Sequence, residues 1–227
     1  MRKKVKKLTV NSFLKDSASL KSYNRPLPCI NILGSGGIGT NLISFLCGKK
    51  DFFNSFKIDL YDYDIVELHN LNRTDLFNIN DVVKKKKKVQ AVKDNLSNNL
   101  SSFTRLNSSH DMKIDENSTF ARSGIIIDAR DTILPSDIPD KTWIKLAYDG
   151  GSNISFVFNP KEVLKRVFRT STRSSYEITP SFYVPPAILS AFCMLFLGIN
   201  KFVNTEKSFI IDFNIDEEIR RACCGRK

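Results

Sequence analysis

A chain of 227 residues that is 41% hydrophobic and 26% charged has the composition of a globular protein and can bury one sizeable core. Its formal net charge of +11 comes from two local runs, residues 2–7 and 84–88, outside which basic residues nearly balance the 24 acidic ones. We interpret these runs as a solvated segment and a mobile loop, and we expect no nucleic-acid partner. The longest apolar run, Ala187–Ile199, has 13 residues and is too short to cross a membrane.

The cysteines favour a reducing compartment. They are five in number, and Cys29, Cys47 and Cys193 lie in apolar runs, as buried free thiols do. No apolar segment follows the basic N-terminus, so we predict no secretory signal. We therefore expect a cytoplasmic protein.

The first predicted elements form a βαβ unit. Residues 1–27 are a basic extension, and residues 28–227 are predicted to form a single nucleotide-binding domain. That domain opens with an apolar strand, the turn Gly34-Ser35-Gly36-Gly37-Ile38-Gly39, and a helix with apolar residues at helical spacing. A second apolar strand ends in Asp62, about 20 residues beyond the turn, where such units place the acid that binds ribose. Because glycines and a helix N-terminus bring backbone amides onto a phosphate, the pattern predicts a nucleotide site.

The rest of the chain continues the α/β pattern. From Asp62 to Phe77 the polar sequence predicts an ordered loop with a short helix, and residues 82–99 predict a helix capped by Asp81. A strand at residues 124–129 would deliver Asp128 and Asp131 to the same sheet edge as Asp62. The other predicted elements are strands at 103–106, 143–147, 154–158 and 208–213, an exposed loop at 160–181, and a buried apolar helix at 187–199.

Taken together, these motifs resemble the ubiquitin-activating-enzyme superfamily and its bacterial relatives ThiF, MoeB and HesA. The resemblance lies in the glycine turn, Asp62-x-Asp64, Asn70-Leu71-Asn72-Arg73, Asp81 with the lysines behind it, and Asp128-Ala129-Arg130-Asp131. It implies a Rossmann-like, ThiF-type α/β fold: a mostly parallel sheet with helices on both faces and a C-terminal antiparallel extension. It also implies a homodimer.

By resemblance, the chain would use ATP and Mg²⁺ to activate the C-terminal carboxylate of a peptide, a ubiquitin-like protein or a sulfur-carrier protein as an acyl-adenylate. Asp131 would hold Mg²⁺. Lys86 would neutralise the α-phosphate region, with Lys84 as the alternative because five consecutive lysines leave the register open. Arg73, Lys86 and Asp131 would thus be the catalytic residues. The nucleotide would be bound by Gly34, Gly36, Gly37 and Gly39 under the phosphates, Asp62 on the ribose with Asp64 beside it, and Asn70 and Arg73 on the phosphates.

Departures from the family pattern restrict this expectation. No cysteine occurs between Cys47 and Cys193, so we expect an enzyme without its own catalytic cysteine. Zinc-binding members use two Cys-x-x-Cys pairs, whereas this chain has only the adjacent Cys223-Cys224, so we expect no zinc. Arg25 resembles the family's arginine that reaches across the dimer.

Two alternatives stay open. One is a non-catalytic ThiF-like subunit that binds or scaffolds another component of a heteromeric complex. The other is a nicotinamide-dependent oxidoreductase, since the glycine spacing also fits that fingerprint. Hydride transfer leaves Asn70 and Arg73 without a role.

Overall fold

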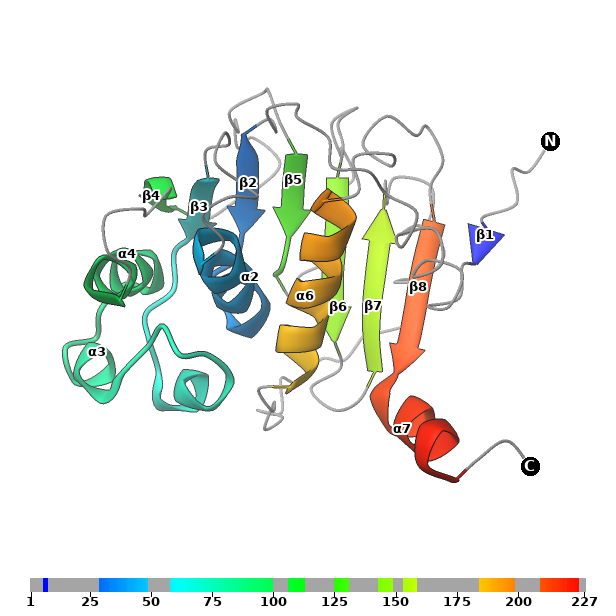
Figure 1. Cartoon of the computed structure of the whole chain (residues 1–227). Helices are drawn as coiled ribbons and strands as arrows, with labels where there is room; N and C mark the ends of the chain where they lie inside the picture. The colour runs from blue at the N-terminus through cyan, green and yellow to red at the C-terminus, as the bar shows by residue number, and fades with distance from the viewer. Residues whose placement is uncertain are drawn as a thin grey trace, which may run out of the picture.

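The computed structural model describes residues 6–7, 29–48, 58–99, 106–112, 125–130, 143–148, 153–158, 184–198 and 209–224. Figure 1 shows the helices and strands within these ranges. In chain order they are β1 Lys6–Lys7, β2 Ile30–Leu33, α2 Gly37–Gly48, β3 Ile58–Asp62, the 3-10 helix η1 Leu68–Arg73, α3 Ile79–Val83, α4 Lys88–Asn99, β4 Leu106–Asp111, β5 Ile125–Asp128, β6 Trp143–Tyr148, β7 Asn153–Phe158, α6 Val184–Gly198, β8 Phe209–Asn214 and α7 Ile215–Cys224.

The strands form one mixed sheet. Across the described residues its order is β1-β8-β7-β6-β5-β2-β3-β4 (Figure 1). The pairs from β4 through β3, β2 and β5 to β6 are parallel, whereas β7 is antiparallel to both β6 and β8. The predicted Rossmann-like sheet with a C-terminal antiparallel extension is confirmed. The carboxyl ends of β3, β2, β5 and β6 therefore meet at one edge, where open α/β sheets bind their ligands.

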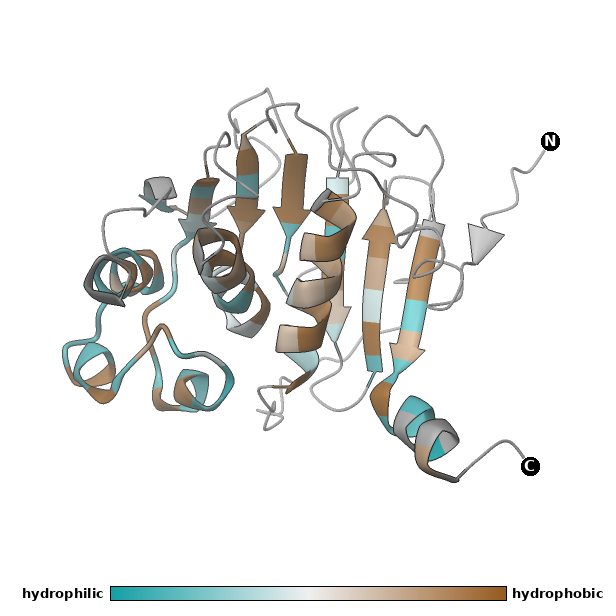
Figure 2. Cartoon of the chain, viewed as in Figure 1, coloured by the Kyte–Doolittle hydropathy of each residue, from teal (hydrophilic) through white to brown (hydrophobic). Residues whose placement is uncertain are grey.

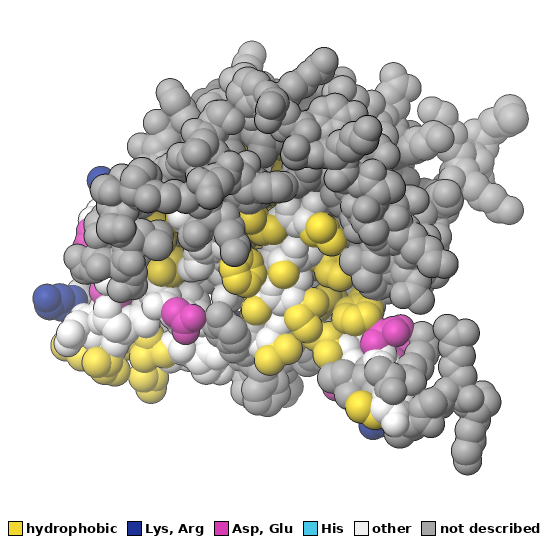
Figure 3. Space-filling view, viewed as in Figure 1, with side chains coloured by type: hydrophobic (Ala, Val, Ile, Leu, Met, Phe, Trp, Pro, Cys, Tyr) yellow, Lys and Arg dark blue, Asp and Glu magenta, His cyan; other side chains and the backbone are white. Residues whose placement is uncertain are grey.

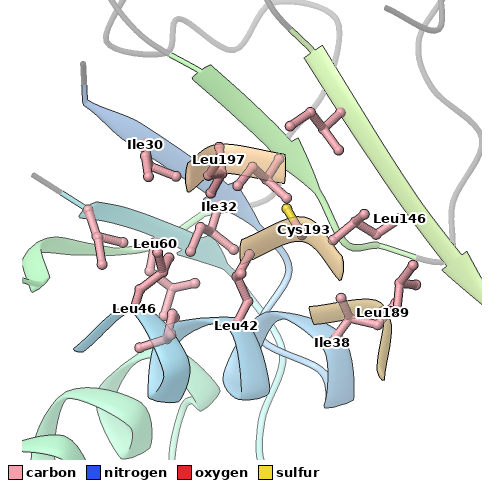
Figure 4. Close-up of a cluster of buried hydrophobic side chains, with 14 of the residues drawn as sticks. Ile30, Ile32, Ile38, Leu42, Leu46, Leu60, Leu146, Leu189, Cys193 and Leu197 are labelled. Carbon is pink, nitrogen blue, oxygen red and sulfur yellow. The ribbon is translucent and has the colours of Figure 1, made fainter. Parts of the chain in front are cut away.

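The main core lies between the sheet and the helices α2, α4 and α6, which share one face. Successive side chains of a strand point to opposite faces of the sheet, so Ile30 and Ile32 of β2 both point into this core. Leu42 of α2 and Cys193 of α6 pack there as well (Figure 4). Figure 2 shows the same hydrophobic character along the central strands and α6. Truncating a side chain as buried as Leu42 to alanine costs about 2–5 kcal/mol.

A smaller cluster lies on the opposite face of the sheet. It contains Leu33, Tyr61, Ile126 and Trp143, with Met112 packed against it. None of the three helices α2, α4 and α6 reaches this cluster, so among the described residues the helices that cover the sheet lie on one face.

Helix α6 is apolar nearly all round, as predicted, and packs against α2 and β7. The hydroxyl of Ser190, its buried polar residue, hydrogen-bonds the carbonyls of Ile38 (2.9 Å) and Pro186 (2.7 Å). Val184 and Leu195 remain 53% and 38% exposed, and Figure 3 shows hydrophobic side chains gathered on the face that carries α6. Within the described residues, no helix has the length and hydropathy needed to span a membrane.

The single helix predicted over residues 82–99 is wrong in one respect, because the structure divides this segment into α3 and α4. Asn78 caps α3: its side chain accepts from the amides of Asn80 and Asp81, and its own amide donates to Asp81 Oδ2. Asp81 is therefore a first-turn residue of α3 and not the cap of a longer helix. The reciprocal hydrogen bonds between Asn78 and Asp81 form a capping box, so the cap lies three residues before the predicted one.

Two further elements differ from the sequence interpretation. Strand β4 covers Leu106–Asp111, later than the predicted 103–106, of which residues 103–105 lie outside the described ranges. Helix α7 follows β8 directly and was not predicted. Its start is marked by Asn214, whose side-chain oxygen accepts from the amide of Glu217 at 2.9 Å.

Candidate functional site

The glycine turn joins β2 to α2 at the carboxyl edge of the sheet. Gly34 has φ +94°, a conformation that residues with a Cβ rarely adopt, and its amide donates to the carbonyl of Tyr61 at 2.8 Å. A Cβ added to Gly39 would lie 1.9 Å from the carbonyl oxygen of Gly34, so no larger residue fits there. The two glycines allow the first turn of α2 to lie directly against the end of β2.

Asp62, predicted to hold ribose, fixes this turn. Its Oδ2 accepts hydrogen bonds from the amide and the hydroxyl of Ser35, at 2.6 and 2.8 Å, and its Oδ1 accepts from the amide of Asp64 at 2.9 Å. A carboxylate has about four acceptor positions, so Asp62 retains capacity for a ligand hydroxyl. Sequence reasoning did not select Ser35, whose position inside the turn was the available signal.

Arg73 lies across the glycine turn. A Cβ added to Gly37 would lie 3.1 Å from Arg73 Cδ, so the absence of a side chain at Gly37 makes room for the arginine. Asn41 of α2 ties the two segments together, since its Nδ2 donates to the carbonyls of Gly37 (2.7 Å) and Arg73 (2.9 Å). Arg73 Nη1 also donates to the hydroxyl of Tyr148 at 3.4 Å. Arg73, predicted to contact the phosphates, therefore lies beside the glycine turn predicted to bind them.

Asn70 is buried in η1, and in the part of the chain that the structure describes only the oxygen of its side-chain amide has a hydrogen-bond partner. Its side chain is 1% exposed, and its Oδ1 accepts from the amide of Glu67 at 3.0 Å. Its Nδ2 has no hydrogen-bond partner among the described residues. A buried donor without a partner is costly in a folded protein, so this group fits a ligand that supplies an acceptor.

Within the lysine run, Lys86, Lys87 and Lys88 form ion pairs, whereas Lys84 and Lys85 are exposed. Lys86, the predicted phosphate contact, pairs with Asp81 at 3.1 Å and Asp94 at 2.9 Å. Hydrogen bonds that Lys86 donates to Asp94 and then to Asp81 raise the pKa of Lys86, and Lys86 in turn lowers the pKa of Asp94. Both partners lie on the helices α3 and α4, so Lys86 ties these helices together in this structure.

Lys88 contacts Asp64, two residues beyond the predicted ribose residue Asp62. It is only 9% exposed, its Nζ lies 2.9 Å from Asp64 Oδ2, and its amide donates to the Asp64 carbonyl at 2.9 Å. Sequence reasoning missed it. The available signal was helical spacing, because Lys88 immediately precedes the buried positions Val89, Val92 and Leu96 of α4.

The pKa of His69 is lowered by burial and by two nearby cations, Arg73 and Lys88. Burial and then the charge of Arg73 lower the pKa of His69, and Lys88 contributes in the same direction, while Glu67 opposes them. The Nδ1 of His69 lies 3.3 Å from Glu67 Oε2. Arg73 and Lys88 thus create a shared positive field beside η1, which suits an anionic ligand.

Asp128 reaches the predicted sheet edge but faces the other side of the sheet. It pairs in register with Leu33, which pairs with Tyr61, so the adjacent Asp62 projects from the opposite face. The fully buried Asp128 carboxylate accepts from Arg130 Nε and Nη2, each at 3.0 Å, and lies 3.3 Å from Lys145 Nζ. Asp128 is therefore held in an ion cluster and does not join Asp62 in one site.

The remaining predicted site residues cannot be placed. Asp131, assigned to Mg²⁺, and Arg25 lie outside the described residues. Within the described part of the chain, no three His, Cys, Asp or Glu side chains come together as a metal site. The assignment of Asp131 to Mg²⁺ stays a prediction.

The four cysteine thiols that the structure describes differ in exposure. Cys47 and Cys193 are buried, Cys29 is half-buried and Cys223 is exposed. Burial raises the pKa of the Cys193 thiol far above its ordinary value, which disfavours a nucleophilic thiolate inside α6.

These elements define a protein of the Rossmann-like α/β class. A parallel strand leads through a glycine turn into a helix N-terminus, and the next strand ends in a carboxylate. The ThiF family model matches residues 29–145, just over half of the chain. The chain belongs to the ThiF family. Comparison with curated proteins gave no match.

Solved structures of MccB share the fold. The crystal structure of E. coli MccB with ATP is 20% identical, covers 82% of this chain and 63% of that chain, and has a TM-score of 0.52. E. coli MccB with MccA-N7isoASN is 18% identical, with 82% and 64% coverage and a TM-score of 0.54. The microcin C7 biosynthetic enzyme MccB in complex with N-formylated MccA is 17% identical, with the same coverage and a TM-score of 0.56. The chain thus spans less than two thirds of the length of these proteins.

Proposed function

We propose that the chain is an ATP-dependent adenylyltransferase that activates a C-terminal carboxylate as an acyl-adenylate. The observation that carries the proposal is the position of Arg73 across the glycine turn at Gly37. A guanidinium beside a phosphate-binding turn stabilises charge on a polyphosphate, whereas hydride transfer to or from a nicotinamide needs no such cation. Membership of the ThiF family supports the same activity.

Each remaining group has a chemical task in this proposal. The amides at the start of α2 would face the phosphates, Asp62 would take the ribose hydroxyls, and Asn70 Nδ2 would donate to an acceptor on the nucleotide. Arg73 and Lys88 would offset the negative charge that grows on pyrophosphate as it leaves. The proposal names Lys88 in place of the predicted Lys86, because Lys86 pairs with two carboxylates, Asp81 and Asp94, whereas Lys88 pairs with one, Asp64.

The family also implies Mg²⁺, which would partly neutralise the ATP phosphates. We retain Asp131 as the residue that would hold it. Asp128 is not proposed as a ligand, because Arg130 and Lys145 already engage its carboxylate.

The activated carboxylate would belong to a peptide, a ubiquitin-like protein or a sulfur-carrier protein. MccB, which shares the fold, has been solved with ATP and with MccA, and this supports a nucleotide and a second ligand for this chain. The adenylate would pass to a separate nucleophile, since Cys193 is buried and no cysteine lies between it and Cys47. The active unit would be residues 28–227, acting in the cytoplasm as a homodimer.

The test is ATP–pyrophosphate exchange with a panel of C-terminal peptides and carrier proteins. We expect exchange that depends on one class of carboxylate substrate and that Arg73→Ala strongly reduces. Thermal unfolding supplies a measurement that needs no acceptor: ATP with Mg²⁺ should raise the melting temperature, and NADH should not. A shift with NADH and none with ATP would refute the proposal.

A non-catalytic ThiF-like binding subunit is the second candidate. The occupation of Lys86 by two carboxylates favours it, because one predicted catalytic cation is already committed to holding helices together. This candidate predicts that ATP stabilises the protein but that no substrate in the panel supports exchange.

A further inference from the structure

Two arginines from different segments flank the glycine turn. Arg73 reaches it from η1, where a Cβ on Gly37 would lie 3.1 Å from Arg73 Cδ. Arg130 reaches it from the end of β5, where a Cβ on Gly34 would lie 3.0 Å from Arg130 Cγ. Both approaches use space that only a glycine leaves open. The turn is therefore enclosed by the stems of two cationic side chains.

Strand β6 holds both arginines, one from each face of the sheet. Tyr148 packs against the main core on the helix-covered face, and its hydroxyl accepts from Arg73 Nη1 at 3.4 Å. Lys145 is 2% exposed and donates from Nζ to the Arg130 carbonyl, while it also pairs with Asp128. Since positions 145 and 148 are an odd number of residues apart, their side chains project from opposite faces.

We propose that β6 positions the phosphate site: Tyr148 and Lys145 set Arg73 and Arg130 around the glycine turn and so determine how strongly the site prefers ATP to adenosine. Neither β6 residue need touch the nucleotide. The inference rests on the proposed ATP site and adds the residues that make it selective for a phosphate chain.

The physical reason is preorganisation. An arginine side chain has several rotatable bonds, and a ligand that must order it loses affinity, whereas a side chain already held in place loses little. Asp128 fixes Arg130 through Nε and Nη2, and Lys145 holds the same carboxylate and the peptide group that links Arg130 to Asp131. Burying an unpaired ammonium is costly, so Lys145 Nζ is held in the one position that contacts both Asp128 and the Arg130 carbonyl.

The first test is Tyr148→Phe, which removes one hydroxyl. Calorimetric titration with ATP in the presence of Mg²⁺, and with adenosine, gives both affinities. We expect the Kd for ATP to rise about threefold to tenfold, the effect of an ordinary hydrogen bond, because the Tyr148 hydroxyl acts on ATP only through Arg73; the Kd for adenosine should be unchanged. Ser155→Ala is the matched control, because it removes a hydroxyl that hydrogen-bonds Asp212 at 2.7 Å on the neighbouring strand pair. That control should alter neither affinity.

The second test is Lys145→Met, with Lys145→Arg as the conservative variant. We expect Lys145→Met to raise the Kd for ATP at least about tenfold and to spare adenosine, and Lys145→Arg to recover most of the loss. Phe196→Leu, a core substitution beside Phe156 and Phe158, supplies a variant of reduced stability but intact nucleotide affinity. Trp143 is the only tryptophan, is buried and lies two residues from Lys145, so its fluorescence reports whether β6 is folded in each variant.

The outcomes separate this inference from the proposed function. If Tyr148→Phe and Lys145→Met retain the wild-type ratio of adenosine to ATP dissociation constants, the positioning role is wrong and the ATP site stands. If the wild-type protein binds ATP no better than adenosine, the phosphates do not lie at the turn and both proposals fail. If Lys145→Met does not fold, the Tyr148→Phe titration decides the matter alone.

Discussion

Replacing Lys88 and Lys86 by methionine, one at a time, separates a phosphate contact from a structural ion pair. Lys88 pairs with Asp64, whose side chain is 49% exposed, so this pair contributes only about 0–1 kcal/mol to stability. A charged hydrogen bond to a phosphate contributes about 1.5–3 kcal/mol, which corresponds to about a tenfold to 150-fold change in Kd. Lys88→Met should therefore weaken ATP binding strongly and leave the unfolding free energy almost unchanged.

Lys86→Met should show the reverse. Its partner Asp81 has a side chain that is only 3% exposed and keeps hydrogen bonds from the Asn78 amide and Asn95 Nδ2 after the lysine is lost. We expect a loss of about 1 kcal/mol in unfolding free energy and no change in ATP affinity. Denaturant unfolding followed by tryptophan fluorescence and calorimetric ATP titration measure the two quantities. If Lys86→Met impairs ATP binding and Lys88→Met does not, the assignment of Lys88 is wrong.

Three further predictions concern the turn, the histidine and the assembly. Gly39→Ala should lower the free energy of unfolding by at least about 2 kcal/mol, because its Cβ would lie 1.9 Å from the Gly34 carbonyl oxygen. Gly36→Ala is the control: its Cβ would have no atom of the described residues within 4 Å, so we expect a loss of less than about 0.5 kcal/mol. Equal denaturant midpoints for the two variants would contradict this prediction. The pKa of His69 is lowered from 6.5, so the unfolded state takes up the proton first as pH falls; stability should decline below about pH 6.5, and His69→Gln should flatten that decline in unfolding measured across this range. Light scattering should give about twice the 25.8 kDa chain mass, with Leu195→Glu shifting it toward the monomer; a wild-type monomer at micromolar concentration would argue against the homodimer.

The nucleotide-binding βαβ unit was predictable because its signals are local. Strand β2, the glycine turn, α2 and β3 follow one another in chain order among the described residues, and each has its own periodicity or turn residue. The acid Asp62 follows at a distance set by this unit, whereas Arg73 was assigned through the resemblance to the family. The structure confirms the order of these elements, and Arg73 lies at the turn as the proposed site requires.

The lysine register was not predicted, because five identical residues differ only in their spacing from the apolar positions of α4. The structure distinguishes them by partners that are distant in sequence: Asp94 for Lys86 and Asp64 for Lys88. The roles of Lys145 and Tyr148 were hidden for the same reason, since each contacts an arginine contributed by another strand or loop. Alternation within β6 predicts that they point to opposite faces, but not what they meet there.

The packing of α6 on α2 has a consequence for synthesis of the chain. The hydrogen bond from Ser190 to the Ile38 carbonyl joins residues 152 positions apart. At about 5–20 residues per second, a ribosome needs roughly 8–30 s to make the intervening segment. During that interval the apolar side of α2 that α6 later covers is exposed, so a nascent chain carrying only the glycine turn and β3 would be a target for chaperones. We therefore expect a fragment of residues 29–145 to aggregate when produced alone.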